Sequence, residues 1–396
     1  MPLNSPAVTY CGYAISESGY GTAARAYVAA LYAAGVPTQV VCVDRMPQWT
    51  VTDALARWYS EPRYAQSVPL WHVEPTQLRR LDRRYPRAIG ITTWETDRLP
   101  QPYVDALNRL GEVWVPSVFN EQTFRRQLSV PVFRLPHPAH AVRTPSVDRA
   151  ALDRALGVPP GSFVFLTVGT WQERKNLPAV IEAFVRAFPC EPRAHLAIKT
   201  AFTFVGPAMA QEQIAAAIRR ACPPDIAEVA DRIHIYSKSW PTQCMEAFAA
   251  RADCYVSLHH GEGWCYPLFD AACAGIPVVA TEGSGPMDYL DARCHRLVRA
   301  ELAPLGRHYA GPRFSFNNEM LWHEPDVEHA ATLMREVFEQ RDEARRQALA
   351  GAALLRTRYA SDVIGRSAAE RLAGFAARDA LVPLLASQAS QAAAHL

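Results

Sequence analysis

Short apolar runs alternate along the chain with segments whose apolar residues recur at helical spacing. In the first part of the chain, the runs that predict buried strands are Val40–Val43, Ala88–Ile91 and Val113–Val115. The segments with helical spacing are Thr22–Ala34, Gln101–Leu110 and Asn120–Leu128. Because strands alternate with helices, this pattern predicts a parallel sheet with helices on both faces.

The alternation starts again after a proline-rich stretch, 130–138, which indicates an extended exit from the first region. A short helix is predicted over Ala150–Leu156, and Gly157–Gly161 then interrupts the chain, so we place a domain boundary here. The strands predicted beyond it are Phe163–Val168, His195–Ile198, Arg232–Tyr236, Cys254–Leu258 and Ile276–Thr281. The helices predicted between them are Leu177–Phe188, Ala208–Ala221, Thr242–Arg251 and Pro267–Ala274.

Two successive βα regions without a β-rich module between them predict an α/β fold of two Rossmann-like domains facing a cleft. The length of 396 residues also exceeds what one hydrophobic core usually serves. We expect the domains to be residues 1–150 and 151–360. Helical spacing continues over Val327–Ala376, and the small polar residues of Ser387–Leu396 predict a frayed end.

Composition narrows the partners and the compartment. Apolar residues make up 49% of the chain and the formal net charge is +2, so no overall field favours nucleic acid or an anionic membrane. The nine cysteines are scattered without a C-x-x-C pair, which argues against a disulfide framework or zinc site and favours a reducing cytoplasm. Neither a signal peptide nor an apolar run long enough for a bilayer is visible, so we expect a cytoplasmic protein that could still touch a membrane surface.

The segment Gly261–Thr281 carries the strongest candidate chemistry. Glu262 lies between two glycines, in a loop at the carboxyl end of a strand, where open α/β sheets bind ligands. The helix predicted to begin near Pro267 has an N-terminus that favours phosphate. We expect Asp270 in its first turn, where a carboxylate can accept ribose hydroxyls. The alternative is that Glu262 is merely solvated and that Asp270 only complements the helix dipole.

A second candidate is the pair Arg174 and Lys175, which follows the strand 163–168 and precedes a helix. Two cations beside a helix N-terminus suit a diphosphate, because they bind it and stabilise the charge that grows on a leaving group. An exposed basic turn would explain them equally well. Lys199, at the end of a strand, is a weaker phosphate candidate.

The segment Gly261–Thr281 resembles the E-x7-E region of family 4 retaining glycosyltransferases, which usually reads Glu-Gly-Phe-Gly-Leu-Pro, then Glu-Ala-Met-Ala, then Gly-x-Pro-Val-Val. The positions that match in type or place are Glu262, Gly263, Trp264, Pro267, Ala271, Gly275, Pro277 and Val278. Asp270 replaces the second Glu and Cys265 replaces the second Gly. The resemblance implies that Glu262 contacts the hydroxyls of the donor sugar and that Asp270 binds the nucleotide ribose. It also implies that the residues after Glu262, Gly263 to Cys265, line the donor.

The same resemblance extends to a basic arrangement, R-x5-K, whose Lys aligns with Lys175. Its Arg would fall at Gly169, so Arg174 would have to substitute for it. In place of a metal ion, these two cations would stabilise the leaving phosphate. No Asp-x-Asp motif occurs in the chain, which also favours a reaction without metal or other cofactor.

Two features of the first domain resemble elements of this family. Gly19 and Gly21 lie in a loop that opens a helix, and the resemblance places this loop toward the donor phosphate and acceptor; a plain turn and helix cap explains it nearly as well. Trp94 and Glu95 follow a strand and would face the sugar or the acceptor. Glu95 and Asp97 could instead form an acidic metal motif, or cap the start of a helix, and we prefer the cap.

The resemblance covers most of the chain and implies the GT-B fold, with a C-terminal helix and tail, 361–396, crossing back to the first domain. It implies a retaining transferase that moves a hexose or related sugar from a nucleotide-sugar to a hydroxyl acceptor, such as a glycan or lipid-linked acceptor in bacterial glycan synthesis. Three alternatives remain. They are a sugar-nucleotide-binding or scaffold subunit of a polysaccharide assembly, a GT-B-fold epimerase or phosphorylase, and a metal-dependent GT-A-like transferase.

Overall fold

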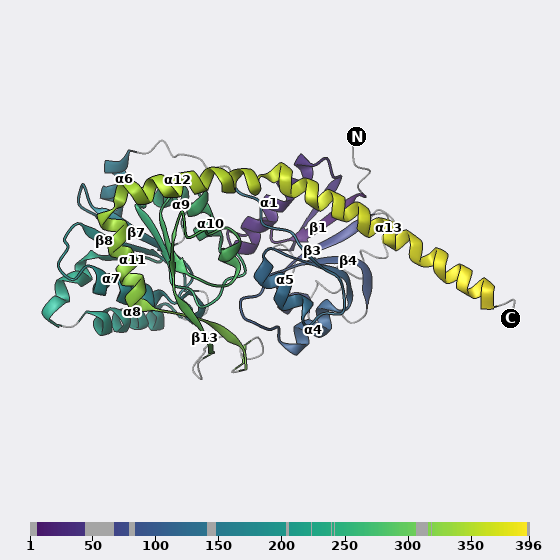
Figure 1. Ribbon diagram of the computed structural model, residues 1–396, viewed down its shortest axis with the longest axis horizontal. Coiled ribbons are helices and arrows are strands. Elements are labelled where there is room, and N and C mark those ends of the chain that lie inside the picture. The colour runs from purple at the N-terminus through teal and green to yellow at the C-terminus, as the bar shows by residue number, and fades with distance from the viewer. Residues whose placement is uncertain are drawn as a thin grey trace. The chain divides into compact units, whose positions relative to one another are not determined.

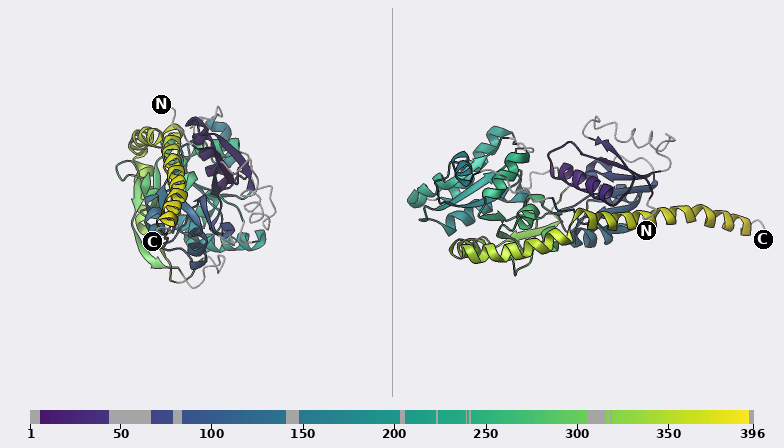
Figure 2. Two further views of the ribbon diagram at one scale, coloured as in Figure 1. Left: turned by 90° about the vertical axis from the view of Figure 1, so that its right-hand side faces the viewer. Right: turned by 90° about the horizontal axis from the view of Figure 1, so that it is seen from above.

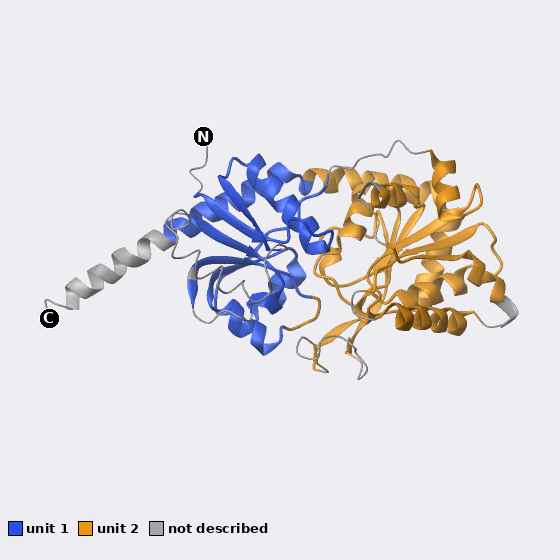
Figure 3. Ribbon diagram, turned by 180° about the vertical axis from the view of Figure 1, so that it is seen from behind, with its two compact units in different colours: residues 1–94, 99–140, 358–396 blue, residues 95–98, 141–357 orange. Residues whose placement is uncertain are grey.

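The computed structural model describes residues 6–43, 67–78, 84–140, 148–202, 206–222, 224–238, 240, 242–305, 316–317 and 319–393. The chain forms two compact units, which Figure 3 distinguishes by colour. Unit 1 comprises residues 1–94, 99–140 and 358–396, and unit 2 comprises residues 95–98 and 141–357. The first and last parts of the chain therefore belong to the same unit.

Unit 1 is built on a parallel sheet with the strand order β2-β1-β3-β4-β5-β6. Its strands are β1 (Val8–Gly12), β2 (Thr38–Cys42), β3 (Val68–His72), β4 (Tyr85–Ile91), β5 (Leu110–Val115) and β6 (Val132–Arg134). Its first helices are α1 (Gly19–Ala33), α3 (Pro75–Leu78), α4 (Gln101–Leu107) and α5 (Val118–Arg125). Figure 1 shows α1 on one side of this sheet and α4 and α5 on the other, as the βα alternation predicts.

Three strands of unit 1 were not predicted, and one predicted strand differs in burial. β1 and β3 are fully buried, but their sequences mix apolar residues with Thr, Gly or Pro, so neither forms a continuous apolar run. β6 lies inside the proline-rich stretch that was expected to be only an extended exit. β2 was predicted to be buried; it is an edge strand, and its side chains are exposed or only half-buried.

Unit 2 repeats the plan with the parallel strand order β12-β11-β10-β7-β8-β9. Its sheet strands are β7 (Phe163–Val168), β8 (Ala194–Lys199), β9 (Ile233–Tyr236), β10 (Cys254–Ser257), β11 (Val278–Thr281) and β12 (Arg296–Val298). Its helical elements up to β11 are α6 (Arg149–Leu156), η3 (Glu173–Lys175), α7 (Leu177–Ala187), α8 (Pro207–Ala221), η4 (Pro224–Arg232), α9 (Thr242–Arg251) and α10 (Tyr266–Cys273). Further on, η5 (Gly285–Asp288) follows β11. The predicted α/β fold with two Rossmann-like sheets is confirmed.

The core of unit 2 includes a cluster of phenylalanines between the sheet and the helices packed on it. The rings of Phe163, Phe165, Phe184, Phe188 and Phe338 lie with centroids 4.8 to 6.1 Å apart. Large aromatic side chains contribute much of a core's buried area, so this cluster holds β7 and α7 together. The end of β7 and the residues that precede α7 are thereby fixed in place.

A two-stranded antiparallel hairpin, β13 (Ala300–Pro304) and β14 (Leu321–Pro325), was not predicted from the sequence. The side chains of β13 are exposed or half-buried, and β14 mixes buried residues with exposed and half-buried ones, so neither strand forms a continuous apolar run. The hairpin joins the sheet region through backbone hydrogen bonds, including one from the His323 N–H to the His260 carbonyl at 2.8 Å. It therefore lies directly beside the loop that follows β10.

The chain ends in three helices, α11 (Val327–Glu339), α12 (Arg341–Arg358) and α13 (Ser361–Ala393). α11 packs on α7 in unit 2, whereas α13 packs on α1 in unit 1 (Figures 1 and 2). The predicted return of the last helix to the N-terminal part is thus confirmed. The frayed end expected from Ser387 was wrong as far as Ala393, because α13 continues to that residue.

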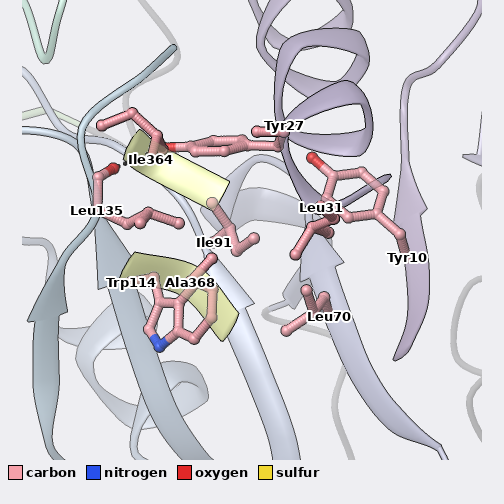
Figure 4. Close-up of a pocket in the computed structure, with 10 residues that line it drawn as sticks. Tyr10, Tyr27, Leu31, Leu70, Ile91, Trp114, Leu135, Ile364 and Ala368 are labelled. Atoms are coloured by element: carbon pink, nitrogen blue, oxygen red, sulfur yellow. Dashed lines mark hydrogen bonds between the residues drawn. The ribbon is translucent and has the colours of Figure 1, made fainter. Parts of the chain in front are cut away.

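Ion pairs and close packing hold α13 within unit 1. The buried carboxylate of Glu112 accepts hydrogen bonds from Arg371 at 2.6 and 2.7 Å and from Arg378 at 2.6 Å. A Cβ on Gly365 would lie 2.1 Å from the carbonyl oxygen of Ala30, so α13 and α1 approach too closely for any side chain at this position. Beside this contact is an apolar cavity of about 10 Å³, lined by residues of α1, the sheet and α13, among them Tyr27 and Ile364 (Figure 4). It is too small for a sugar.

Candidate functional site

The loop between β10 and α10 is held in an unusual backbone conformation at its end. α10 begins at Tyr266, directly after Cys265, whose φ of 69° lies in the left-handed region that favours glycine. Asp270 was expected in the first turn of this helix, but no acidic residue lies there, because the helix begins at Tyr266 and Asp270 follows one turn later. The helix-dipole explanation for Asp270 is correspondingly weaker, since that effect fades beyond the first turn.

Glu262 lies at the centre of a compact ionic cluster. Its carboxylate pairs with the Lys175 ammonium through one oxygen and with Arg174 Nη1, at 3.0 Å, through the other. The same Nη1 donates a hydrogen bond to the carbonyl oxygen of Gly261 at 2.8 Å. The three residues predicted to be catalytic are therefore brought together, from two segments 87 positions apart in the sequence.

The cluster is shielded from water, and it combines one carboxylate with two cations. Glu262 is only 5% exposed, and burial alone would raise the pKa of its carboxyl group. The charges of Lys175 and Arg174 outweigh that effect and lower the pKa of Glu262 to about 2. Glu262 is therefore ionised at neutral pH, and it cannot serve there as a general acid.

Position 169, where the R-x5-K arrangement has its arginine, is a glycine in this chain. A Cβ on Gly169 would lie 3.3 Å from the Cγ and Cδ atoms of Lys175, so the lysine stem occupies the space beside it. Arg174, the residue before Lys175 in η3, contacts Glu262. The geometry thus agrees with Arg174 supplying the second cation.

The backbone of Glu262 is fixed by residues after β11 that sequence reasoning missed. Ser284 Oγ accepts a hydrogen bond from the Glu262 N–H at 3.1 Å, and the Gly285 N–H donates one to the Glu262 carbonyl at 2.8 Å. A Cβ on Gly285 would lie 2.1 Å from the carbonyl oxygen of Gly263, so only glycine at position 285 permits this close approach. The sequence offered no signal for Ser284 beyond its place at the carboxyl end of a strand.

Strained backbone gathers around the cluster. Among the described residues, the non-glycine positions with positive φ are Asn176, Cys265 and Ser284. Asn176 follows Lys175, Cys265 ends the Glu262 loop, and Ser284 binds the Glu262 N–H. Such conformations persist only where the surroundings impose them, and they concentrate at functional sites.

Trp264 and Cys265 contribute packing beneath the loop. Trp264 is 3% exposed, and its ring lies 5.0 Å from Phe269 and 5.1 Å from Tyr289 between centroids. The Tyr289 hydroxyl donates to the carbonyl of Trp264 at 2.7 Å. Burial raises the pKa of the Cys265 thiol to about 12, so this cysteine is not a nucleophile at neutral pH.

His259 also lies beside the cluster, in the part of the loop that comes before Glu262. Its ring is completely buried and Nδ1 lies 3.0 Å from Ser257 Oγ. Burial lowers the pKa of His259 to about 4, and the nearby Glu262 charge only partly opposes this effect. His259 is therefore a neutral packing residue at physiological pH.

Lys199 lies apart from the ionic cluster in its contacts. Its ammonium donates to the Thr200 carbonyl at 3.2 Å and lies 5.4 Å from the ring centre of Trp240. Lys199 is 8% exposed, and burial lowers its pKa. It is not bonded to Glu262, so its predicted phosphate contact stays a prediction.

The candidate residues of unit 1, Gly19, Gly21 and Trp94, make packing contacts or begin a helix in the described part of the chain. Gly19 begins α1 with open space around it, whereas a Cβ on Gly21 would lie 2.0 Å from the Ser16 carbonyl oxygen. Trp94 is 4% exposed, and its ring packs edge-on against Tyr103, with centroids 5.4 Å apart. A role for these residues toward the donor or acceptor stays a prediction.

Glu95 and Asp97 do not begin a helix, so the preferred capping interpretation was wrong. Asp97 Oδ1 instead accepts a hydrogen bond from the Leu321 N–H at 2.6 Å, and α4 begins only at Gln101. Glu95 lies 3.6 Å from Arg174 Nη2. Within the described residues, no group of three or more His, Cys, Asp or Glu side chains is arranged to hold a metal ion.

Part of unit 2 matches a known protein family. Residues 148–299 match the model of the family described as "Glycosyl transferases group 1". Among curated proteins, none matches the sequence.

No helix in the described part of the chain is long and apolar enough to cross a membrane.

Several solved structures share the fold. HepE from Anabaena, in complex with UDP and glucose, is 14% identical with a TM-score of 0.66, and the match covers 93% of this chain and 100% of HepE. Sucrose-phosphate synthase from Thermosynechococcus elongatus is 12% identical with a TM-score of 0.68, covering 94% and 100% of the two chains. WaaG, a glycosyltransferase involved in lipopolysaccharide biosynthesis, is 14% identical with a TM-score of 0.58, covering 92% and 99%. At these identities the likeness establishes the fold, which is that of the GT-B glycosyltransferases.

Proposed function

We propose that this enzyme transfers a hexose or related sugar from a nucleotide-sugar to a hydroxyl acceptor with retention of configuration. The proposal proceeds from the match of residues 148–299 to the group 1 glycosyl transferases. The observation that carries the proposal is the buried ionic cluster of Glu262 with Arg174 and Lys175 at the carboxyl ends of the sheet strands. Ligands bind at this edge in open α/β sheets.

In this proposal, the cluster binds the donor through opposite charges. Arg174 and Lys175 hold the diphosphate, and they stabilise the negative charge that grows on it as the bond to the sugar breaks. Glu262 stays anionic and accepts hydrogen bonds from hydroxyls of the sugar. Asp270 accepts hydrogen bonds from the ribose. A UDP donor is supported by the HepE structures, which contain UDP with glucose, or UDP-glucose.

The transfer step follows from these roles. The bond between the anomeric carbon and the phosphate oxygen breaks, and the acceptor oxygen forms a bond to that carbon on the same face. The proton of the acceptor hydroxyl passes to the leaving phosphate oxygen, and the nucleoside diphosphate departs. Glu262 neither receives this proton nor forms a covalent intermediate, unlike the carboxylates of retaining hydrolases.

We also propose that the reaction needs no metal ion, because two protein cations are already placed for the diphosphate. The acceptor is proposed to be a bacterial glycan or a lipid-linked sugar, with the protein working in the cytoplasm and touching the membrane only peripherally. WaaG, a glycosyltransferase of lipopolysaccharide biosynthesis with the same fold, supports this choice of acceptor class.

The test is to incubate the enzyme with a panel of UDP-sugars and candidate acceptors in EDTA, and to follow the anomeric proton by NMR. We expect the donor's anomeric configuration in the product, at a rate unaffected by chelation. An inverted product would contradict the retaining mechanism, and loss of turnover in EDTA would contradict metal independence. Donor consumption without acceptor would instead identify an epimerase or a hydrolase, and a phosphate requirement would identify a phosphorylase.

A further inference from the structure

Four residues, 95–98, belong to unit 2, although the chain on either side of them belongs to unit 1. Two hydrogen bonds connect these residues to β14. The Asp97 N–H donates to the Leu321 carbonyl at 3.1 Å, and the Leu321 N–H donates to Asp97 Oδ1 at 2.6 Å. We call residues 95–98 the inserted segment. Its backbone is therefore positioned by hydrogen bonds from a strand beside the candidate site.

The inserted segment also lies directly against the Glu262 loop. A Cβ on Gly261 would lie only 2.0 Å from the carbonyl oxygen of Glu95 and 3.6 Å from the Glu95 Cβ. A distance of 2.0 Å is shorter than any van der Waals contact, so only glycine at this position permits the backbone of Glu95 to approach. Gly261 is thus required for the packing of the inserted segment.

The Glu95 side chain reaches the second face of Arg174. Its carboxylate lies 3.6 Å from Arg174 Nη2, while Arg174 Nη1 contacts Glu262 at 3.0 Å and the Gly261 carbonyl at 2.8 Å. The Arg174 and Glu95 side chains are 12% and 20% exposed, so this pair is more shielded than an ordinary surface ion pair. Both terminal nitrogens of the guanidinium are held by the protein.

We propose that Glu95 is a positioning residue that acts through Arg174. It holds the guanidinium in the orientation that presents it to the donor's diphosphate, so that less conformational freedom is lost when the donor binds. This inference rests on the proposed function, in which Arg174 binds the diphosphate. It replaces the expectation that Glu95 itself faces the sugar or the acceptor.

A positioning role and a purely electrostatic role predict opposite results for Glu95→Gln. A carboxylate that acted only as a negative charge near the diphosphate would repel it, and its removal would tighten binding. A carboxylate that holds Arg174 in place has the reverse effect, because its loss frees the guanidinium. The sign of the change in UDP affinity therefore separates the two roles.

The experiment is a double-mutant cycle read by calorimetric titration with UDP. We expect Glu95→Gln to raise the Kd for UDP about fivefold in the wild-type background and to leave it unchanged in the Arg174→Ala background. Tighter or unchanged binding in the single variant, or equal effects in both backgrounds, would overturn the proposal. Asp97→Asn is the matched control, because it removes a charge from the same segment, keeps the acceptor for the Leu321 N–H and does not touch Arg174.

A second readout keeps the two proposals distinguishable. If the wild-type protein does not bind UDP, the UDP donor proposed above fails. The cycle is then repeated on the urea unfolding midpoint. There we expect Glu95→Gln to lower the midpoint in the wild-type background but not in the Arg174→Ala background. Equal shifts in both backgrounds would show that Glu95 does not act through Arg174.

Discussion

At the scale of single residues, the site is a balance of charges arranged before any ligand arrives. Arg174 and Lys175 bring Glu262 well below its ordinary pKa, even though its burial acts in the opposite direction. A buried carboxylate is tolerated only when it is paired in this way. A donor diphosphate would share the same two cations, so its negative charge would enter a site where both partner cations are already in place.

The low pKa of Glu262 predicts a specific acid sensitivity. Because the folded-state pKa is about 2 and the ordinary value is 4.5, the ionised carboxylate stabilises the fold above about pH 4.5. At neutral pH this contribution is on the order of 3 kcal/mol, and it is lost as the pH falls from about 4.5 toward 2. We therefore expect Glu262→Gln to be less stable than wild type at pH 7, with a difference that shrinks below pH 4.5.

Urea unfolding of both proteins between pH 7 and pH 3 measures this difference. His259 also makes the fold acid-sensitive, since its pKa is lowered to about 4, and in wild type its effect falls mainly between pH 6.5 and 4. Because the Glu262 charge partly opposes this shift, Glu262→Gln lowers the pKa of His259 further, so the effect of His259 extends to lower pH in the variant. A stability difference that stayed constant down to pH 3 would show that the two cations do not hold Glu262 in its ionised form.

The backbone conformation of Ser284 predicts that glycine at this position gives a more stable protein than alanine, the reverse of the usual order. Its φ of 59° and ψ of −153° belong to a region that is accessible almost only to glycine. Ser284→Ala and Ser284→Gly both remove the acceptor for the Glu262 N–H, but only glycine relieves the strain. We expect the glycine variant to be more stable than the alanine variant by about 1 kcal/mol or more, measured by urea unfolding. An alanine variant of equal or greater stability would contradict the strained conformation.

At the scale of elements, the predictions from the sequence succeeded where apolar runs were continuous. β7 and α9 have the predicted boundaries, and α7 differs by one residue, because each combines a clear apolar pattern with a turn signal on either side. β1 and β3 escaped prediction because Thr, Gly and Pro interrupt their apolar residues.

The site shows the same division. The grouping of Glu262 with Arg174 and Lys175 could be predicted because each lies after a strand and before a helix. Ser284 and the true contacts of Glu95 could not, because they depend on the packing of segments far apart in the sequence. A β-hairpin partner for Asp97 left no local pattern to detect.

The packing of α13 on α1 gives a test at this scale, with a control on the same helix. A methyl group at Gly365 would meet the Ala30 carbonyl at 2.1 Å, whereas Gly374 has nothing within 4 Å of an added Cβ. We expect Gly365→Ala to destabilise the protein by about 1–3 kcal/mol through overpacking. Gly374→Ala should be neutral or stabilising by up to about 1 kcal/mol, because alanine favours the helix.

Urea unfolding of the two variants measures these opposite effects. If both substitutions had the same sign and size, the close approach of α13 to α1 would be wrong. The comparison does not depend on enzymatic activity, so it tests the return of the last helix to unit 1 independently of the proposed function.

At the scale of the whole molecule, the two units differ in the features that bear on function. Unit 2 contains the residues that match the group 1 glycosyl transferase model, the ionic cluster and the inserted segment. Unit 1 repeats the Rossmann-like plan and is closed by the C-terminal helix of the chain. Arg174, Lys175, Glu262 and Asp270, which we propose to bind the donor, all belong to unit 2.

The central claim is that the chain's own cations do the electrostatic work of glycosyl transfer. The measurement that tests it most directly is the turnover of a UDP-sugar in EDTA by wild type, Lys175→Ala and Lys238→Ala. Lys238 is an exposed lysine that follows β9, two places from β7 in the strand order, so it controls for the loss of one positive charge. We expect wild type and Lys238→Ala to turn over equally, and Lys175→Ala to lose about 10²-fold or more in kcat. A Lys175→Ala enzyme with kcat within about twofold of wild type would contradict the claim.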